Sequence, residues 1–339
     1  MIIDFDKLDD DYKKDGIYSL QLEVGDKCNQ GCIYCYMNAI KDEKNVLSDE
    51  KIKEILFDSK KIGISAIEWL GGEPLLRDSI FQHIKLAKKL GFRNNIWTGG
   101  LPLSSDNVKE NIIKYTRPGL LSVHVSTLNP RLYQKLHPNR STKDLDIIIQ
   151  SIKKIIDMGY PSENMLNSVT FTGLQKADDM IDTINYFKDK FGIACSLNVY
   201  HTYLRPNIPQ SDLKHFIPSS KEIEKVYNHL SKQNAGKKLP MNCVNKQYCS
   251  ATIAILSNGN VTPCATIRRT KTFNVNDESF FDIVNKNRDY LIFKKMKDKK
   301  NLNEECRTCE LNSECWGCRS RSYASGNGIY GMDPRCFRN

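Results

Sequence analysis

The feature that most constrains this chain is the run Cys28-Asn29-Gln30-Gly31-Cys32-Ile33-Tyr34-Cys35. It comes just after Leu20-Gln21-Leu22-Glu23-Val24, whose strict alternation of apolar and polar residues predicts a β-strand. Three thiolates on one short loop can hold three irons of a cubane iron–sulfur cluster and leave the fourth iron open to another ligand. A zinc loop is the alternative, although zinc sites prefer four closed ligands arranged in pairs.

Strand and helix patterns then alternate six times. A helix is expected from the cap-like Ser48, with acidic residues in its first turn, and another over 80–90 before Gly91. Repeated strand–helix units predict an α/β fold with a parallel sheet and right-handed crossovers. The predicted strands are 18–24, 66–70, 95–98, 121–126, 168–172 and 194–200.

One face of nearly every predicted strand is polar. Val123 and Val125, for example, alternate with Ser122, His124 and Ser126. Because parallel strands covered on both faces are normally apolar throughout, this pattern predicts a wet inner cavity, with a sheet facing solvent as the alternative. The candidates for substrate contact, each of them also suited to be an ordinary wall residue, are Glu23, Glu68, His124, Tyr200, Tyr203 and Arg205.

Composition narrows the setting. The chain has 339 residues, 12 cysteines and a formal net charge of +10. Its first residues are acidic and no apolar run reaches the length of a membrane span, so a cytoplasmic protein with cysteines as metal ligands is expected. The lysines predict solvated helix faces, with attraction of an acidic partner as the alternative, and no motif indicates nucleic-acid binding.

The last part of the chain is rich in cysteine. A linker with one short helix is predicted over 205–240, which separates a core domain of 1–204 from a module of 241–339. Asn258-Gly259 predicts a hairpin turn that brings Cys249 and Cys264 onto paired strands. Taken alone, the spacing Cys306-x2-Cys309-x5-Cys315-x2-Cys318 is equally typical of a zinc knuckle.

Together, two motifs resemble the radical S-adenosylmethionine (SAM) superfamily: the loop Cys28, Cys32, Cys35 with an aromatic residue before its last cysteine, and Gly71-Gly72-Glu73-Pro74 after the second strand. The resemblance implies a partial (β/α)6 TIM barrel. It also implies a [4Fe–4S] cluster on the three cysteines and SAM as cofactor, with Glu73 at the amino group of SAM. Thr98 opens a Thr-Gly-Gly turn where the family often has Thr-Asn-Gly. The implied cofactor-binding residues are Tyr34, Gly71, Gly72, Glu73, Thr98, Ser126 and Arg140.

The C-terminal cysteines resemble the SPASM extension of that superfamily, which implies two auxiliary [4Fe–4S] clusters and therefore three clusters in all. By this resemblance, one auxiliary cluster would be held by Cys243, Cys249, Cys264 and Cys318, and the other by Cys306, Cys309, Cys315 and Cys336. Cys195 is left over, and its parity in the last predicted strand places it on the helix side as a buried small hydrophobe.

The resemblance implies an enzyme that cleaves SAM reductively to a 5′-deoxyadenosyl radical, which abstracts a hydrogen atom from a peptide or protein. The expected outcome is a crosslink, an epimerisation or an oxidation. The cysteine spacing most resembles the anaerobic sulfatase-maturating enzymes. However, Ala265 stands where that group has a catalytic aspartate, which counts against formylglycine formation.

Two alternatives remain. One is dehydrogenation or epimerisation of a small molecule such as a sugar alcohol or an amino-acid derivative, and the other is a non-catalytic iron–sulfur or zinc protein. The expected redox partner of the enzyme is a flavodoxin or ferredoxin-type reductant. The substrate is expected to be recognised either by the barrel itself or through a separate peptide-recognition protein.

Overall fold

The computed structural model describes residues 3–39, 41–201, 210–242, 244–268 and 273–338. Within these residues, nine strands form one sheet in the order β6-β5-β4-β3-β2-β1-β7-β8-β9. The strands are β1 (Ser19–Glu23), β2 (Ala66–Leu70), β3 (Arg93–Thr98), β4 (Leu121–Val123), β5 (Met165–Phe171), β6 (Ala194–Val199), β7 (Thr252–Ile255), β8 (Asn260–Thr262) and β9 (Phe273–Asn274). The α-helices are α1 (Phe5–Lys13), α2 (Asp49–Ile62), α3 (Ile80–Lys89), α4 (Asp106–Tyr115), α5 (Pro130–Leu136), α6 (Lys143–Asp157), α7 (Ala177–Phe191), α8 (Ser220–Gln233), α9 (Lys246–Ser250), α10 (Phe280–Leu291), α11 (Glu304–Thr308) and α12 (Arg319–Ala324).

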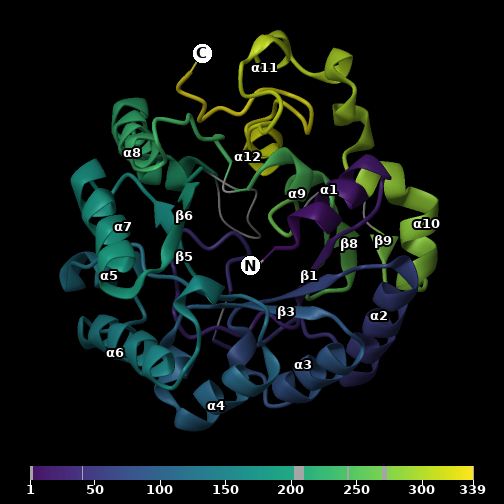
Figure 1. Cartoon of the computed structure of the whole chain (residues 1–339), viewed down its shortest axis with the longest axis horizontal. Helices are drawn as coiled ribbons and strands as arrows, with labels where there is room; N and C mark the ends of the chain where they lie inside the picture. Colours follow the sequence, from purple (N-terminus) through teal and green to yellow (C-terminus); the bar gives the residue numbers. More distant parts are fainter. Residues whose placement is uncertain (1–2, 40, 202–209, 243, 269–272, 339) are drawn as a thin grey trace.

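Strands β1 to β6 run parallel to one another. The crossover helices α2, α3, α4, α6 and α7 lie on the outside of this curved row of strands (Figure 1). The predicted α/β fold, an incomplete barrel followed by a cysteine-rich extension, is therefore confirmed.

Local sequence explains the helix that follows the cysteine loop. The Ser48 side chain accepts a hydrogen bond from the Lys51 N–H and caps α2, as the sequence predicted. Ile52, Ile55 and Leu56 are buried on the face of α2 that meets the sheet. The helix ends at Gly63, whose φ of 91° is the left-handed conformation typical of a C-cap.

The apolar faces of the strands form the main core with these helices. Leu20, Leu22, Val123 and Val125 belong to one buried cluster together with the inner faces of α2, α3 and α6. Each fully buried leucine or valine contributes about 1.5–3 kcal/mol relative to an exposed one. The polar residues that alternate with them therefore point to the concave side of the sheet.

The fourth strand is shorter than predicted. The sequence predicts a strand over 121–126, whereas β4 ends at Val123. Beyond that point, the Asn167 side chain replaces the ladder: its Nδ2 donates to the Val125 carbonyl and its Oδ1 accepts from the Val125 N–H, both at 2.9 Å. The alternation continues past the strand because a side-chain amide satisfies the same backbone groups as a neighbouring strand does.

The C-terminal region continues the barrel sheet. β7 lies parallel to β1, with Ser19 opposite Thr252, and β7 and β8 form the predicted hairpin. The prediction that its paired strands carry Cys249 and Cys264 is wrong, because Cys249 lies in α9 before β7 and Cys264 follows the end of β8. At the other end of the parallel strands, the buried Arg321 of α12 donates to the Val199 carbonyl at the end of β6. The cysteine-rich region therefore contacts both ends of the row β1–β6.

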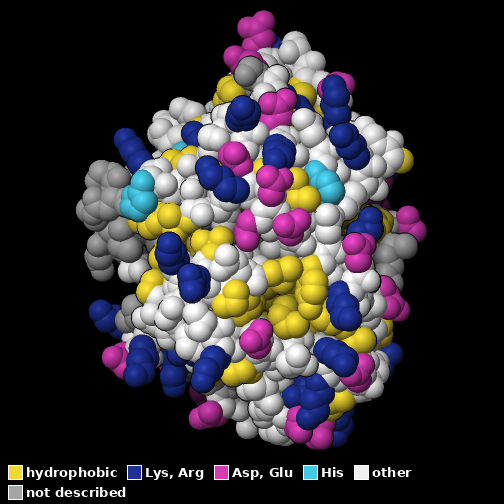
Figure 2. All heavy atoms as spheres, turned by 90° about the vertical axis from the view of Figure 1, so that its left-hand side faces the viewer, with side chains coloured by type: hydrophobic (Ala, Val, Ile, Leu, Met, Phe, Trp, Pro, Cys, Tyr) yellow, Lys and Arg dark blue, Asp and Glu magenta, His cyan; other side chains and the backbone are white. Residues whose placement is uncertain are grey.

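One face of the molecule carries charges of both signs (Figure 2). Figure 2 shows one face on which Lys and Arg side chains are interspersed with Asp and Glu around a hollowed apolar area. In the described part of the chain, no helix has the length and apolar character that crossing a membrane requires.

Candidate iron–sulfur and SAM site

The cysteine loop leaves the end of β1 and places its three thiols close together. Burial raises the pKa of Cys28 to about 11, and the charge of Cys35 raises it further. Burial also raises the pKa of Cys32 well above its ordinary value, with further contributions from Cys35 and Cys28. Such a donor set fits a group of positive metal ions, because nearby cations favour the thiolates that burial opposes.

Apolar side chains cover this loop. Tyr34, Leu136 and Tyr200 form a buried cluster, and Cys32 and Ile33 pack against it. Water is excluded from one side of the thiols, which strengthens any electrostatic interaction made there.

Tyr34 lies between two histidines. Its hydroxyl oxygen is 2.5 Å from Nε2 of His124 and 2.6 Å from Nε2 of His137. The Nδ1 of His137 lies 2.9 Å from the Tyr133 carbonyl, which can only accept, so His137 Nε2 accepts from the Tyr34 hydroxyl. Burial lowers the pKa of His124 to about 3 and that of His137 to about 4, so both rings are neutral at pH 7.

The glycines of the Gly-Gly-Glu turn pack against the backbone that leads into the cysteine loop. A Cβ on Gly71, whose φ is 147°, would lie 2.5 Å from the Gly25 carbonyl oxygen, and one on Gly72 would lie 2.2 Å from that of Lys27. The Gly72 N–H donates to the Gly25 carbonyl, and the Glu73 N–H donates to the Lys27 carbonyl. In this structure, the close approach that requires glycine is therefore between two segments of the chain itself.

Glu73 places its carboxylate among backbone and side-chain donors. Oε2 accepts from the Thr98 hydroxyl and the Gly99 N–H, both at 2.8 Å, while Oε1 accepts from the Leu75 N–H at 3.1 Å. Burial nevertheless raises the pKa of this carboxyl to about 7. A cation such as the ammonium of an amino acid would favour the ionised form here.

Two further predicted SAM contacts remain: Ser126 lies beside His124, and the segment carrying Arg140 lies beside the cysteine loop. The Ser126 hydroxyl is 3.3 Å from His124 Nε2 and accepts from the Thr170 N–H, so it adjoins Tyr34 through His124. Arg140 is 3.7 Å from Asp144 at the start of α6. Its neighbour Asn139 lies against Gly31, so the segment carrying Arg140 borders the cysteine loop.

Glu68 is a structural residue of the inner wall. Its carboxylate accepts from Ser19 (2.9 Å), Asn95 (2.6 Å), Trp97 (2.6 Å) and Tyr248 (2.7 Å), and it is 1% exposed. The prediction of a wet cavity is therefore wrong around Glu68, because these polar side chains bond to one another instead of to water.

The other wall candidates have different surroundings. Glu23 is fully buried and pairs with Arg268 at 2.6 Å, and it also accepts from the Ser257 N–H. Tyr200 packs on the cysteine loop with Tyr34, as described above. The predicted candidates Tyr203 and Arg205 lie outside the described residues. Cys195 packs against two apolar clusters, and burial raises the pKa of its thiol to about 12.

Arg268 and Tyr36 were missed by the sequence analysis. The Arg268 guanidinium lies 5.7 Å from the centre of the Tyr36 ring, and Glu23 raises its pKa against the opposing effect of burial. Tyr36 follows the last cysteine of the loop, and its pKa is raised by burial, with contributions from Cys35 and Cys264. Tyr36 therefore lies between the cysteine loop and the C-terminal cysteines. No local pattern marks Arg268, since its partner lies 245 positions away in the sequence.

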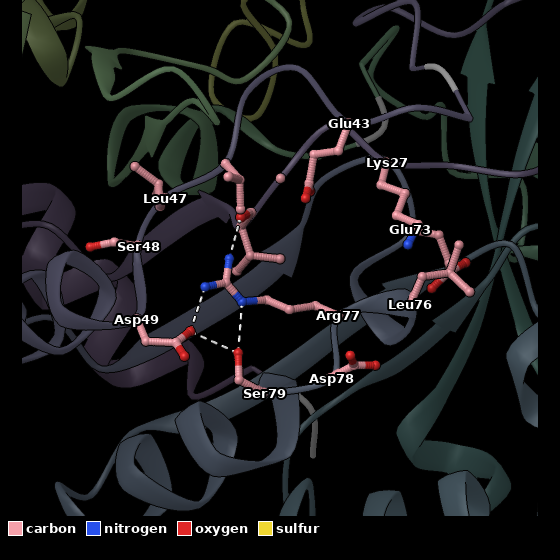
Figure 3. Close-up of a pocket in the computed structure, with 13 residues that line it drawn as sticks. Lys27, Glu43, Leu47, Ser48, Asp49, Glu73, Leu76, Arg77, Asp78 and Ser79 are labelled. Carbon is pink, nitrogen blue, oxygen red and sulfur yellow. Dashed lines mark hydrogen bonds and ion pairs between the residues drawn. The ribbon is translucent and has the colours of Figure 1, made fainter.

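A pocket of about 440 Å³ lies between Glu73 of the Gly-Gly-Glu turn and Asp49 at the start of α2. Figure 3 shows Arg77 extending across it toward Asp49 and Ser79, with Lys27 and Glu73 at the opposite side. Arg77 donates to Asp49, to Ser79 and to the Val24 carbonyl at the end of β1. These bonds satisfy its charge and fix the starts of α2 and α3 relative to β1.

The described C-terminal cysteines are placed in two neighbourhoods. Cys249, Cys264 and Cys306 pack against one apolar cluster, whereas Cys315 and Cys336 pack against another. The charge of Cys318 contributes to the raised pKa of Cys264, after burial and against hydrogen bonds from Thr266. Burial raises the pKa of Cys306 to about 11, and the charges of Cys315, Cys336 and Cys309 raise it further. Cys243 lies outside the described residues, and the predicted ligand sets stay predictions.

Backbone N–H groups are directed at several of these sulfurs. The Gly317 nitrogen lies 3.1 Å from the Cys315 sulfur. The Leu311 nitrogen lies 3.4 Å from the Cys309 sulfur, and the Ala39 nitrogen lies 3.4 Å from the Cys35 sulfur. Such N–H groups stabilise thiolates and tune cluster potentials. Among the residues that the structure describes, no three His, Cys, Asp or Glu side chains meet closely enough for a single metal ion. A cubane cluster has a different requirement, because it takes one thiolate at each iron corner.

Comparison with family models gives two matches. Residues 22–187 match the radical SAM superfamily, and residues 243–310 match SPASM, described as an iron–sulfur cluster-binding domain. The first match begins in β1 and contains the cysteine loop and the Gly-Gly-Glu turn.

Curated relatives include probable GTP 3′,8-cyclases. That of Methanocaldococcus jannaschii is 36% identical over 42% of this chain and 46% of its own length, so the match spans about half of that relative. That of Methanococcus maripaludis is 25% identical over 82% of this chain and 91% of its own length.

Solved structures with a similar fold include Streptococcus suis SuiB bound to its precursor peptide SuiA. That chain has a TM-score of 0.69 and 17% identity, and the match covers 98% of this chain and 79% of the other. Another is anSMEcpe with bound AdoMet and the Cp18Cys peptide, with a TM-score of 0.67 and 14% identity, covering 94% of this chain and 93% of the other. At these identities the likeness shows the fold.

Proposed function

The chain belongs to the radical SAM superfamily and carries a C-terminal SPASM region, and we propose that it modifies a peptide or protein by hydrogen-atom abstraction. When bound, the [4Fe–4S] cluster and SAM supply reductive SAM cleavage, giving methionine and a 5′-deoxyadenosyl radical that takes a hydrogen atom from substrate carbon. The electron comes from an external flavodoxin or ferredoxin-type donor.

In this proposal, each described site residue has a definite task. Cys28, Cys32 and Cys35 hold the cluster, and Glu73 holds the amino group of SAM. Thr98 and the Gly99 N–H orient the Glu73 carboxylate through two 2.8 Å hydrogen bonds. The apolar cover by Tyr34, Leu136 and Tyr200 keeps water from the reacting groups.

The C-terminal cysteines would hold two further [4Fe–4S] clusters, which makes three per chain. A cluster with four protein ligands has no corner for SAM, so its plausible task is electron transfer. Tyr36 follows Cys35 and packs against an apolar cluster that includes Ala265, the residue after Cys264, which supports a short distance between the cysteine loop and the nearer auxiliary set. A cluster held there would supply an electron acceptor close to the cysteine loop.

The observation that favours a peptide over a nucleotide is the charge of the inner wall. A triphosphate needs several unpaired cations for recognition. At this wall, Arg268 is paired with Glu23, and burial lowers the pKa of His124 so that its ring is neutral at pH 7. A neutral peptide segment fits such a wall better than a nucleoside triphosphate does.

GTP cyclisation is the second candidate, and the M. jannaschii relative favours it. The M. jannaschii match covers 42% of this chain, and the M. maripaludis relative, also named a probable GTP 3′,8-cyclase, matches 82% of it at 25% identity. The fold likeness to the precursor-peptide complex covers 98% of the chain at 17% identity.

The proposal can be tested with anaerobically reconstituted protein, SAM and a low-potential reductant. Formation of 5′-deoxyadenosine is expected, and it should increase when a candidate precursor peptide is added. Mass spectrometry should then show loss of hydrogen from the peptide, or deuterium uptake from D2O if the reaction is an epimerisation. Turnover of GTP instead of the peptide would support the second candidate, and failure to cleave SAM would contradict both.

A further inference from the structure

Gln30 lies inside the cysteine loop and reaches out of it. Its side chain is 4% exposed. Nε2 donates to the Gly99 carbonyl at 2.9 Å, and Oε1 lies 3.5 Å from the Cys32 sulfur. One buried amide therefore contacts both a cysteine of the loop and the turn after β3.

The absence of a side chain at Gly99 leaves space for this amide. It does not have a positive φ, so its backbone does not require glycine. A Cβ at this position, however, would lie 2.1 Å from Gln30 Nε2 and 2.3 Å from Gln30 Cδ. The glycine is needed because the Gln30 amide fills the space beside it.

The same residue continues toward Glu73. Gly99 accepts from Gln30 through its carbonyl, and the N–H on its other side donates to Glu73 Oε2. Hydrogen bonds therefore lead from Gln30 in the cysteine loop through Gly99 to the Glu73 carboxylate. Thr98 supports the turn by donating to the same carboxylate oxygen and accepting from the Gly100 N–H at 3.0 Å.

We propose that Gln30 is a positioning residue, which couples the cysteine loop to the carboxylate that receives the amino group of SAM. This inference rests on the proposed function. The amide holds Gly99 in place through its carbonyl, and the N–H of the same residue donates to Glu73. A cluster bound to Cys32 and SAM bound at Glu73 are thereby held in one relative position.

The test compares Gln30→Met, Gln30→Ala, Gly99→Ala and the double variant Gln30→Ala/Gly99→Ala with the wild type. Methionine conserves the side-chain volume but removes the hydrogen bonds, and the added Cβ of Gly99→Ala displaces the amide. Gln30→Met should retain its iron and its thermal midpoint. Its dissociation constant for SAM should rise about tenfold, and the change in the cluster's EPR spectrum on SAM addition should be reduced.

Gly99→Ala should reproduce the loss of SAM affinity. In the Gln30→Ala background, the same alanine should have little further effect on SAM affinity or on unfolding, because the space is then empty. Gln233→Met, a change of the same kind on the exposed face of α8, serves as a control and should leave SAM binding unchanged.

Wild-type SAM affinity in Gln30→Met, or additive effects of the two sites, would overturn the inference. So would a loss of iron and stability without a selective loss of SAM binding, since that would indicate a purely structural role. If the wild type itself neither binds nor cleaves SAM, the proposed function fails. The unfolding cycle between Gln30 and Gly99, measured without SAM, still reports on the contact.

Discussion

Glu73 is a buried carboxyl group whose ionised form is required for pairing with an ammonium. Its carboxyl has donors on both oxygens, yet burial raises its pKa to about 7. Below that pH, the free protein binds a proton that must leave before an ammonium can pair with the carboxylate.

The affinity for SAM should therefore depend on pH. Because the pKa of Glu73 is raised, the carboxylate is the minor form at pH 6 and the major form at pH 7.5, so SAM binding should tighten roughly five- to tenfold over that interval. Calorimetry on reconstituted protein measures this, and Glu73→Gln should bind more weakly at every pH and lose the dependence. A flat profile for the wild type would contradict the assignment of Glu73.

Arg321 and Asp333 form a buried ion pair, each 1% exposed. Arg321→Met should destabilise the protein by about 3–5 kcal/mol, because it leaves the Asp333 charge buried and unpaired. Urea denaturation of the folded chain measures this change. Lys238→Met breaks the exposed pair with Glu310 and should change the unfolding free energy by less than about 1 kcal/mol. Equal effects of the two changes would contradict the argument.

The Arg321–Asp333 pair also predicts how the stability of the protein changes with pH. Burial opposes ionisation of Asp333, but Arg321 and the hydrogen bonds from Cys318 and Arg335 hold its pKa below the ordinary value. A lowered carboxyl pKa adds stability that is fully present above the unfolded value, about 4, and is lost as the pH falls through the folded value.

At the scale of elements, the segment that follows β4 is held by the Asn167 side chain. Asn167 makes two hydrogen bonds to the Val125 backbone and thereby holds the segment that leads to His124 and Ser126 in place. This segment carries two of the predicted site residues beyond the end of the regular strand.

Asn167→Ala should cost about 2–4 kcal/mol in unfolding free energy, since it leaves a buried N–H and a buried carbonyl without partners. Chemical denaturation measures the cost. The control is Asn111→Ala on the exposed surface of α4, where the amide bonds only to Asn107, and little change is expected. A cost for Asn167→Ala as small as that of the control would show that water replaces the amide.

At the scale of the whole molecule, the barrel and the cysteine-rich region share one sheet. β1 pairs with β2 on one side and with β7 on the other, and Glu23 of β1 pairs with Arg268. The strand that leads into the cysteine loop is therefore also the strand against which the C-terminal region is built.

Three cubane clusters predict about twelve irons per reconstituted chain. Cys306→Ala should lower this by about four, while 5′-deoxyadenosine formation without substrate continues, because the loop Cys28–Cys35 is unchanged. Iron analysis and chromatography measure both quantities. Zinc in the C-terminal region of the anaerobically purified protein would contradict the electron-transfer role.

The sequence by itself determined the strand–helix alternation, the cap of α2, the hairpin of β7 and β8, and the two motifs that identify the family. These features are local: thiol spacing, turn residues and apolar periodicity act over a few positions. The tertiary structure decided that Glu68 is a bonded wall residue, that Arg268 neutralises Glu23 and that Asn167 takes over from β4. It also decided that Gln30 requires glycine at position 99. These pairs are distant in sequence, and buried polar groups select whichever partner the packed chain brings within hydrogen-bonding distance.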